Sequence, residues 1–289
     1  MLRTERDVLT GAVVVGVDGS PGSRAALDWA GQDAALRGRR LVLLAAATPS
    51  AGAPAPAYDV TGSPALVEAR EYAEARWPDL EVLPLAVGER AAPALIEASS
   101  HAAVVVLGSH GHSAVDRFVL GSVTHHVTAH ALCPVVVVRG HGSGWRLPVT
   151  VGLDDAPAAH EAIGFALEVA ATRGVPLVAV RAWEGRPSAV YGAWATDPEV
   201  LAGMRAEQER LAHDVLAGWP EKYPEVEVVV RLVRQHPSLA IVAESHRSQL
   251  LVVGARGHGE FQGMTFGSVA AAACSRAECP VAVVPARQG

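Results

Sequence analysis

Short apolar runs alternate along this chain with segments in which apolar residues recur every three or four positions. The runs are rich in Val and Leu and have no polar alternation, which is typical of parallel strands buried on both faces. They predict strands at 12–18, 41–47, 81–87, 103–107 and 134–138, and again at 148–153, 176–182, 226–232, 250–253 and 281–284. Between two of these runs, Ala26, Leu27 and Ala30 share one helical face. Alternating strands and helices predict a doubly wound α/β fold with right-handed crossovers.

The second half of the chain repeats the first. Three segments recur at an offset of 146 residues: Val104–Gly111 as Leu250–Gly257, Gly121–Val123 as Gly267–Val269, and Cys133–Val135 as Cys279–Val281. Nearer the start of each half, Val13–Asp18 matches Val149–Asp154 at an offset of 136 residues. A fixed offset indicates a tandem duplication. We therefore predict two tandem, doubly wound, five-stranded parallel-sheet domains at 1–140 and 147–289, with the Gly- and Ser-rich Arg139–Gly144 as linker.

Candidate chemistry gathers where the predicted strands end. In an open α/β sheet, ligands bind beyond the carboxyl ends of the strands, where the strand order reverses. Asp18 and Asp154 end the first strands, and a Gly-x-x-Gly segment follows each fourth strand, with a Gly-Ser pair nine residues later. Glycines let backbone amides approach phosphate oxygens, and a Gly-Ser pair that opens a helix adds a hydroxyl and the helix dipole. One such segment alone is more often a tight turn; its recurrence beside an Asp favours a nucleotide site.

These residues resemble the tandem universal stress proteins of actinobacteria over nearly the whole chain. The Val-Gly-Val-Asp-Gly-Ser start and the Cys-Pro-Val-Val-Val-Val end of the first repeat add to the resemblance. It implies ATP as the ligand, with Mg²⁺ as a possible companion, in an α/β fold related to that of adenine-nucleotide α-hydrolases. The implied contacts are Asp18, Ala46, Gly108, Gly111, Gly121, Ser122 and Val123 in one site, and Asp154, Ala182, Gly254, Gly257, Gly267, Ser268 and Val269 in the other. The contacts assigned to Ala46 and Ala182 are inferred only from an alignment of the second strands of the two repeats.

The second repeat departs from the first at three places beside the predicted site. Asp155 stands where the first repeat has Gly19, Ala156 where it has Ser20, and Ala255-Arg256 where it has Ser109-His110. An extra carboxylate beside Asp154 would repel a triphosphate or help to hold a divalent ion. Arg256 would offset the repulsion by reaching phosphate oxygens. We therefore expect two occupied sites with unequal affinity.

Composition narrows the classes of function. The chain has 289 residues, of which 50% are hydrophobic and 19% charged, so we expect a globular protein. A formal net charge of -6 offers no positive field for nucleic acid or anionic lipid. No segment approaches the ~20 apolar residues of a spanning helix, and the N-terminus lacks a signal sequence, so we expect a cytoplasmic chain without a membrane partner. Its three cysteines then predict reduced, buried thiols rather than disulfides.

Catalytic motifs are scarce. Lys222 is the single lysine, which argues against Schiff-base chemistry and a lysine-bearing phosphate loop. There is no nucleophile elbow and no HExxH, and Ser122 and Ser268 fit phosphate contacts better than nucleophiles. The leading hypothesis is an ATP-binding stress-response regulator with an unknown protein partner and at most weak ATPase activity. The alternatives are a slow ATP-hydrolysing or nucleotide-transferring enzyme of the same superfamily, and a nucleotide-free protein-interaction module.

Two further patterns carry weaker predictions. Five histidines gather in the first repeat: His110, His112, His125, His126 and His130. They are either a metal site or, as the lack of acidic and Cys partners at ligand spacing favours, surface imidazoles beside the phosphate loop. The last strands of the two repeats, Val135–Val138 and Val281–Val284, would leave apolar edges. The family resemblance predicts that these strands pair with each other, and a homodimer is a further expectation.

Overall fold

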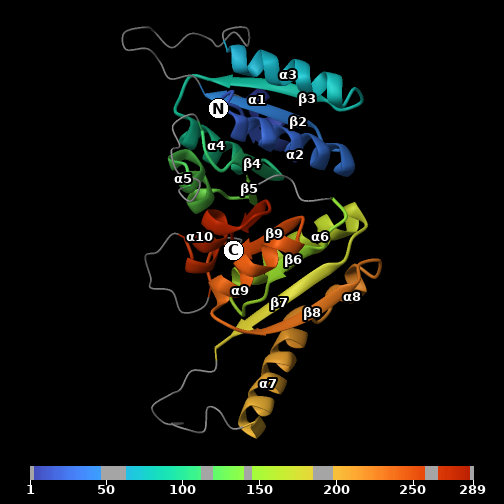
Figure 1. The fold of residues 1–289 in the computed structure, drawn as a ribbon. Helices are drawn as coiled ribbons and strands as arrows, with labels where there is room; N and C mark the ends of the chain where they lie inside the picture. The colour runs from blue at the N-terminus through green and yellow to red at the C-terminus, as the bar shows by residue number, and fades with distance from the viewer. Residues whose placement is uncertain are drawn as a thin grey trace. The chain divides into compact units, whose positions relative to one another are not determined.

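The computed structural model describes residues 3–46, 63–111, 120–139, 145–184, 198–257 and 266–286 (Figure 1). The first repeat contains α1 (Arg3–Leu9), β1 (Val13–Gly16), α2 (Pro21–Arg37), β2 (Leu41–Ala46), α3 (Pro64–Arg76), β3 (Val82–Val87), α4 (Ala91–Ser99), β4 (Val104–Gly108), α5 (Ser122–His130) and β5 (Val135–Val138). The second contains β6 (Val149–Gly152), α6 (Pro157–Arg173), β7 (Leu177–Trp183), α7 (Pro198–Leu216), α8 (Trp219–Lys222), β8 (Val228–Arg234), α9 (Pro237–Glu244), a 3-10 turn (Ser245–Arg247), β9 (Leu250–Gly254), α10 (Ser268–Arg276) and β10 (Val281–Val284).

The predicted strands are all present, with ends that differ from the prediction by two residues or fewer. The apolar runs are strands because both of their faces are covered. Every side chain of Val13–Val15 and of Val104–Val106 is fully buried. Burial on both faces explains why these runs carry no polar alternation.

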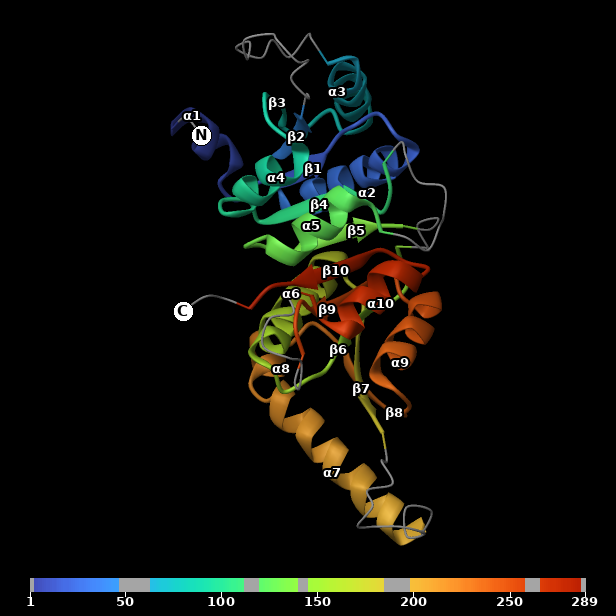
Figure 2. The ribbon, with the colours of Figure 1, turned by 90° about the vertical axis from the view of Figure 1, so that its left-hand side faces the viewer.

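The chain forms two compact units, and the first consists of Met1–Gly140 together with Pro280–Pro285. Its strands run in the order β3-β2-β1-β4-β5, and neighbours within this set are parallel. Helices α2 and α3 pack together on the sheet, as do α4 and α5, and right-handed crossovers put the two pairs on opposite faces (Figure 2). The strand order therefore reverses between β1 and β4.

Strand β10 belongs to this first unit although it comes from the second repeat. It pairs with β5 in an antiparallel ladder that joins Val281 to Val137 and Val283 to Val135. The predicted pairing of the two last strands is thus confirmed. Because β10 pairs with β5, the first compact unit contains Pro280–Pro285 in addition to the predicted domain 1–140. The domain limits 1–140 and 147–289 stay a prediction.

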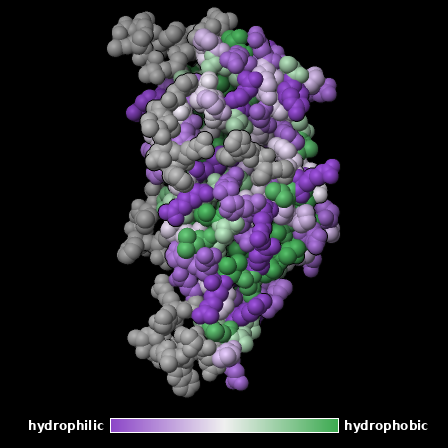
Figure 3. All heavy atoms as spheres, in the orientation of Figure 1, coloured by the Kyte–Doolittle hydropathy of each residue, from purple (hydrophilic) through white to green (hydrophobic). Residues whose placement is uncertain are grey.

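The second unit comprises His141–Cys279 and Ala286–Gly289. Its strands run in the order β9-β6-β7-β8 and are parallel, so the order reverses between β6 and β9. Both repeats are therefore α/β folds with a mostly parallel sheet, as predicted. Hydrophobic residues also reach the surface of this unit (Figure 3). One of them is Val229 on β8, which is 40% exposed. Among the described residues, no helix is both long and apolar enough to cross a membrane.

Helices α2 and α6 begin at equivalent positions but with different caps. The Ser20 hydroxyl accepts a 3.1 Å hydrogen bond from the Ser23 amide, whereas Ala156 caps α6 without a side-chain bond. Loss of an N-cap hydroxyl typically costs ~1 kcal/mol. We expect Ser20→Ala to lower the free energy of unfolding by about this amount and Ala156→Ser to raise it by a smaller amount, as measured by urea denaturation. A neutral Ser20→Ala substitution would contradict this role for the cap.

Cys133, Cys274 and Cys279 are buried thiols that form no disulfide bond, as predicted. Burial raises the pKa of the Cys133 thiol from 9.0 to about 12, because the thiolate would lose its solvation. This thiol therefore contributes stability that is complete below pH 9.0 and is lost as the pH rises toward 12. We expect Cys133 to resist alkylation at pH 8 in the folded protein and to react once urea unfolds it. Mass spectrometry of modified peptides would measure this, and rapid modification of the folded protein would contradict it.

Candidate functional site

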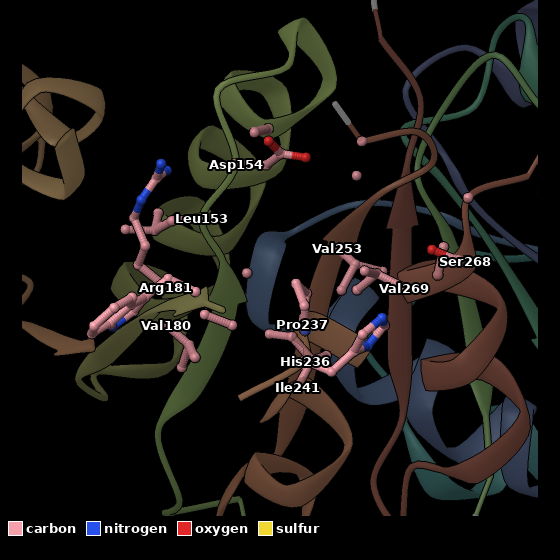
Figure 4. Close-up of a pocket in the computed structure, with 18 of the residues that line it drawn as sticks. Leu153, Asp154, Val180, Arg181, His236, Pro237, Ile241, Val253, Ser268 and Val269 are labelled. Carbon is pink, nitrogen blue, oxygen red and sulfur yellow. The ribbon is translucent and has the colours of Figure 1, made fainter. Parts of the chain in front are cut away.

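A cavity of about 490 Å³ lies in the second unit, at the carboxyl ends of the strands where their order reverses (Figure 4). It is lined by residues that are far apart in the sequence but that the topology brings to one edge of the sheet. All the residues predicted for the second site are among them: Asp154, Ala182, Gly254, Gly257, Gly267, Ser268 and Val269. They follow β6, lie in β7, end or follow β9, and lie at the start of α10. The arrangement matches the place where open α/β sheets bind ligands.

Apolar side chains form much of the cavity wall. Val180, Ile241 and Val253 line it and are each almost fully buried, and His236 and Pro237 line it at the start of α9 (Figure 4). Sequence reasoning did not single out these residues. Their pattern is that of ordinary core positions, so only the folded chain distinguishes a cavity wall from a filled core.

The strand-terminal Asp lies against the last glycine of the Gly-x-x-Gly segment in both repeats. A Cβ added to Gly257 would lie 2.7 Å from Asp154 Oδ2, and one added to Gly111 would lie 2.8 Å from Asp18 Oδ2. A side chain at either glycine would therefore displace the carboxylate. In each repeat, the predicted Asp and the predicted Gly-x-x-Gly loop therefore lie next to each other.

The first glycine of each segment has a packing reason as well. A Cβ on Gly108 would lie 2.5 Å from the backbone carbonyl carbon of Gly22 in α2. The equivalent atom on Gly254 would lie 3.1 Å from the Cβ of Ala158 in α6. These glycines let a helix pack closely against the end of the strand. From the sequence alone, this packing role cannot be told apart from a role in letting phosphate groups approach the backbone.

The Gly-Ser pairs fold back onto the same loops. The Gly121 amide donates a hydrogen bond to the Ser109 carbonyl, and the Gly267 amide donates one to the Ala255 carbonyl. Both bonds have a donor–acceptor distance of 2.9 Å. Helices α5 and α10 begin at the next residue, and the first turn of α10 lines the cavity. The backbone amides of a first helical turn are donors suited to an anion. Ser122 and Val123 are exposed at the start of α5, and Ala46 is half-buried at the end of β2.

Asp155 is paired rather than isolated. Its carboxylate accepts hydrogen bonds of 2.8 and 3.2 Å from the guanidinium of Arg181, whose Nε donates to Gln208 Oε1 at 3.0 Å. The charge that the sequence analysis expected Arg256 to offset is thus already compensated by Arg181. Arg256 is exposed and lines the cavity. The sequence alone did not point to Arg181 as the partner of Asp155. A signal was present, because Arg181 stands where the first repeat has Ala45, just as Asp155 stands where it has Gly19.

The histidines of the first repeat make local contacts. His110 Nδ1 lies 2.9 Å from the Ser109 hydroxyl, and His130 Nδ1 lies 2.9 Å from the His126 carbonyl oxygen. His112 falls outside the described residues. In the described ranges, no three His, Cys, Asp or Glu side chains form a group that could hold a metal ion.

Comparison with known proteins identifies the family. The model of the universal stress protein family matches residues 10–139 and again 147–285. The chain belongs to the universal stress protein family. As a tandem universal stress protein it is 35% identical over 294 residues to one from Mycolicibacterium smegmatis, covering 95% of this chain and 97% of that one. It is also 35% identical to one from Mycobacterium tuberculosis H37Rv, covering 94% and 96% of the two chains.

Solved structures agree on the fold. A universal stress protein from Archaeoglobus fulgidus superposes with a TM-score of 0.60, covering 96% of this chain and 98% of that one at 21% sequence identity. The predicted family and the tandem architecture of this universal stress protein are therefore confirmed.

Proposed function

We propose that this universal stress protein binds ATP in one site per repeat and acts as a cytoplasmic regulator of the stress response with little or no catalysis. One observation carries the proposal. The residues for which the family resemblance implies ligand contact in the second repeat all line a single cavity.

The cavity fits a nucleotide in size and in chemistry. Its volume of about 490 Å³ falls within the ~300–1,000 Å³ typical of small-molecule sites. Val180, Ile241 and Val253 offer an apolar wall to a base, and Asp154 offers a carboxylate to ribose hydroxyls. The start of α10 and the side chain of Arg256 offer positive potential to phosphates. Mg²⁺ would be held mainly by the phosphate oxygens, as is usual for this ion with nucleotides.

The first repeat supports a second site of the same kind. Asp18 and Gly111 lie against each other as Asp154 and Gly257 do. The sites differ in charge, because the second has Arg256 where the first has His110. Two sites with unequal affinity follow from these differences.

Weak catalysis is part of the proposal. An enzyme would need a base or an activated nucleophile beside the transferred phosphate. Ser268, at the start of α10, is suited to hold a phosphate as an N-terminal helix residue. We expect phosphate release far below the ~1–10³ s⁻¹ of typical enzymes, measured with purified protein and excess MgATP. Sustained release within that range would favour the enzyme alternative.

The ligand is tested by identifying what the protein carries. Purified protein would be denatured and the released small molecules analysed by mass spectrometry, with a denatured unrelated protein from the same purification as control. The proposal predicts an adenine nucleotide, ATP above all. Release of no nucleotide, together with no binding of added ATP, would favour the protein-interaction module.

Homodimerisation and a protein partner belong to the same proposal. A regulator needs a surface that nucleotide binding changes and that a partner recognises. We expect a dimeric mass by light scattering at micromolar concentration. A monomeric mass under these conditions would contradict the dimer and leave ATP binding unaffected.

A further inference from the structure

The second repeat holds an ion pair beside its nucleotide cavity that the first repeat replaces with two small residues. Asp155 and Arg181 form this pair, and Gly19 and Ala45 stand at the equivalent positions. Arg181 lines the cavity, and its side chain is only 10% exposed, against 44% for Asp155. A buried guanidinium requires its partner, because an uncompensated buried charge is costly. The two substitutions therefore belong together.

The turns that carry the strand-terminal Asp are built differently in the two repeats. In the first, Gly19 takes a φ of 80°, and the Ser20 amide donates to Asp18 Oδ1 at 2.9 Å. In the second, the Asp155 amide itself donates to Asp154 Oδ1 at 2.7 Å. No non-glycine residue in the described ranges has a positive φ, so the turn at Asp155 cannot copy that at Gly19.

The ion pair connects this different turn to the rest of the second unit. Arg181 comes from β7 and holds both carboxylate oxygens of Asp155, at 2.8 and 3.2 Å. Its Nε is held in turn by Gln208 of α7 at 3.0 Å. Two parallel hydrogen bonds fix the relative orientation of the two groups as well as their distance. The residue next to Asp154 is thereby tied to two elements of the unit.

We propose that the Asp155–Arg181 pair, with Gln208, positions Asp154 for nucleotide binding at the second site and keeps the charge of Asp155 away from the phosphates. The first repeat achieves the same end with Gly19 and without a charge. This proposal rests on the proposed function and goes beyond it, because it names residues that set the affinity of one site alone. Arg181 and Gln208 are positioning residues that act through Asp154.

The test uses the first repeat as its template. Arg181→Ala alone leaves Asp155 unpaired beside Asp154, so its negative charge would oppose a triphosphate. Asp155→Gly/Arg181→Ala recreates the combination of the first repeat. All variants would carry Gly111→Leu, which is expected to remove the first site, so that calorimetric titration of MgATP reports the second site alone.

The parent is the protein that carries Gly111→Leu alone. Relative to it, we expect Arg181→Ala to weaken ATP binding about tenfold, and we expect the dissociation constant of the double variant to lie within about threefold of the parental value. Gln208→Ala should weaken binding less than Arg181→Ala. Arg210→Ala is the matched control, because Arg210 lies on α7 like Gln208 and, within the part of the chain that the structure describes, its ion pairs are with Glu207 and Asp214 of that helix. Its affinity should equal that of the parent.

Three outcomes would overturn the inference. Parental affinity in Arg181→Ala would do so. A double variant as weak as the single one would do so too, since Arg181 would then act by its own charge or packing and not through Asp155. If Arg181→Ala fails to fold by circular dichroism, Arg181→Met keeps the apolar stem, and parental affinity in that variant overturns the inference too. Absence of ATP binding in the parent, and in wild type, would instead refute the proposed function itself.

Discussion

Replacing Gly257 by Leu is expected to abolish ATP binding at the second site while the first site still binds. A Cβ at this position would already lie 2.7 Å from Asp154 Oδ2, and a Leu side chain would also fill the space that phosphates must enter. We expect affinity to fall by at least about a hundredfold, which corresponds to about 2.8 kcal/mol. Isothermal titration calorimetry would show the stoichiometry falling from two ATP per chain to one.

The control for this variant is Gly203→Leu, because Gly203 lies in α7 and an added Cβ would meet no atom of the described residues within 4 Å apart from its own helix backbone. It should bind ATP as wild type does. Gly111→Leu should remove the first site in the same way, and the double variant should bind no ATP. Two sites of unchanged affinity in Gly257→Leu would mean that ATP binds elsewhere.

Replacing Gly108 by Ala is expected to lower the free energy of unfolding more than the same substitution at the equivalent Gly254. The added Cβ would lie 2.5 Å from the Gly22 backbone, which cannot yield without moving α2 away from β4. Overpacking of this kind costs about 3 kcal/mol. The free energy of unfolding from urea denaturation measures the loss.

Gly254→Ala is the matched comparison, since it adds the same methyl group at the equivalent position. Its nearest contacts are longer than that at Gly108: the Cβ of Ala158 lies at 3.1 Å and the Ala158 backbone at 3.3 Å. A small adjustment therefore suffices, and we expect a cost of about 1 kcal/mol. Equal losses in the two variants would contradict the packing explanation for Gly108.

The sequence predicts the fold well because its signals are local and repeated. Val13–Val15 and Val104–Val106 are apolar without interruption since both faces of the sheet are covered. The offset between Gly111 and Gly257 marks the duplication without any knowledge of structure. The gathering of Asp154, Gly257 and Ser268 in one cavity follows from parallel topology, which sends the carboxyl ends of all strands to one edge.

Other features depend on contacts that no local pattern encodes. Arg181 looks like an interruption of an apolar strand, and only the fold shows that it holds Asp155. Gly108 looks like another loop glycine, although its constraint comes from Gly22, far away in sequence. Ile241 looks like a core residue until the cavity beside it is seen. The role of each of these three residues depends on contacts with residues far away in the sequence.

The central claim, that this universal stress protein binds one ATP in each repeat, is tested most directly by titrating MgATP into nucleotide-free wild-type protein. Isothermal titration calorimetry at micromolar protein concentration would give the stoichiometry and both affinities. The structure-based account predicts two ATP molecules per chain, bound with different affinities. Absence of binding would contradict it, and a single ATP per chain would contradict the claim of a site in each repeat.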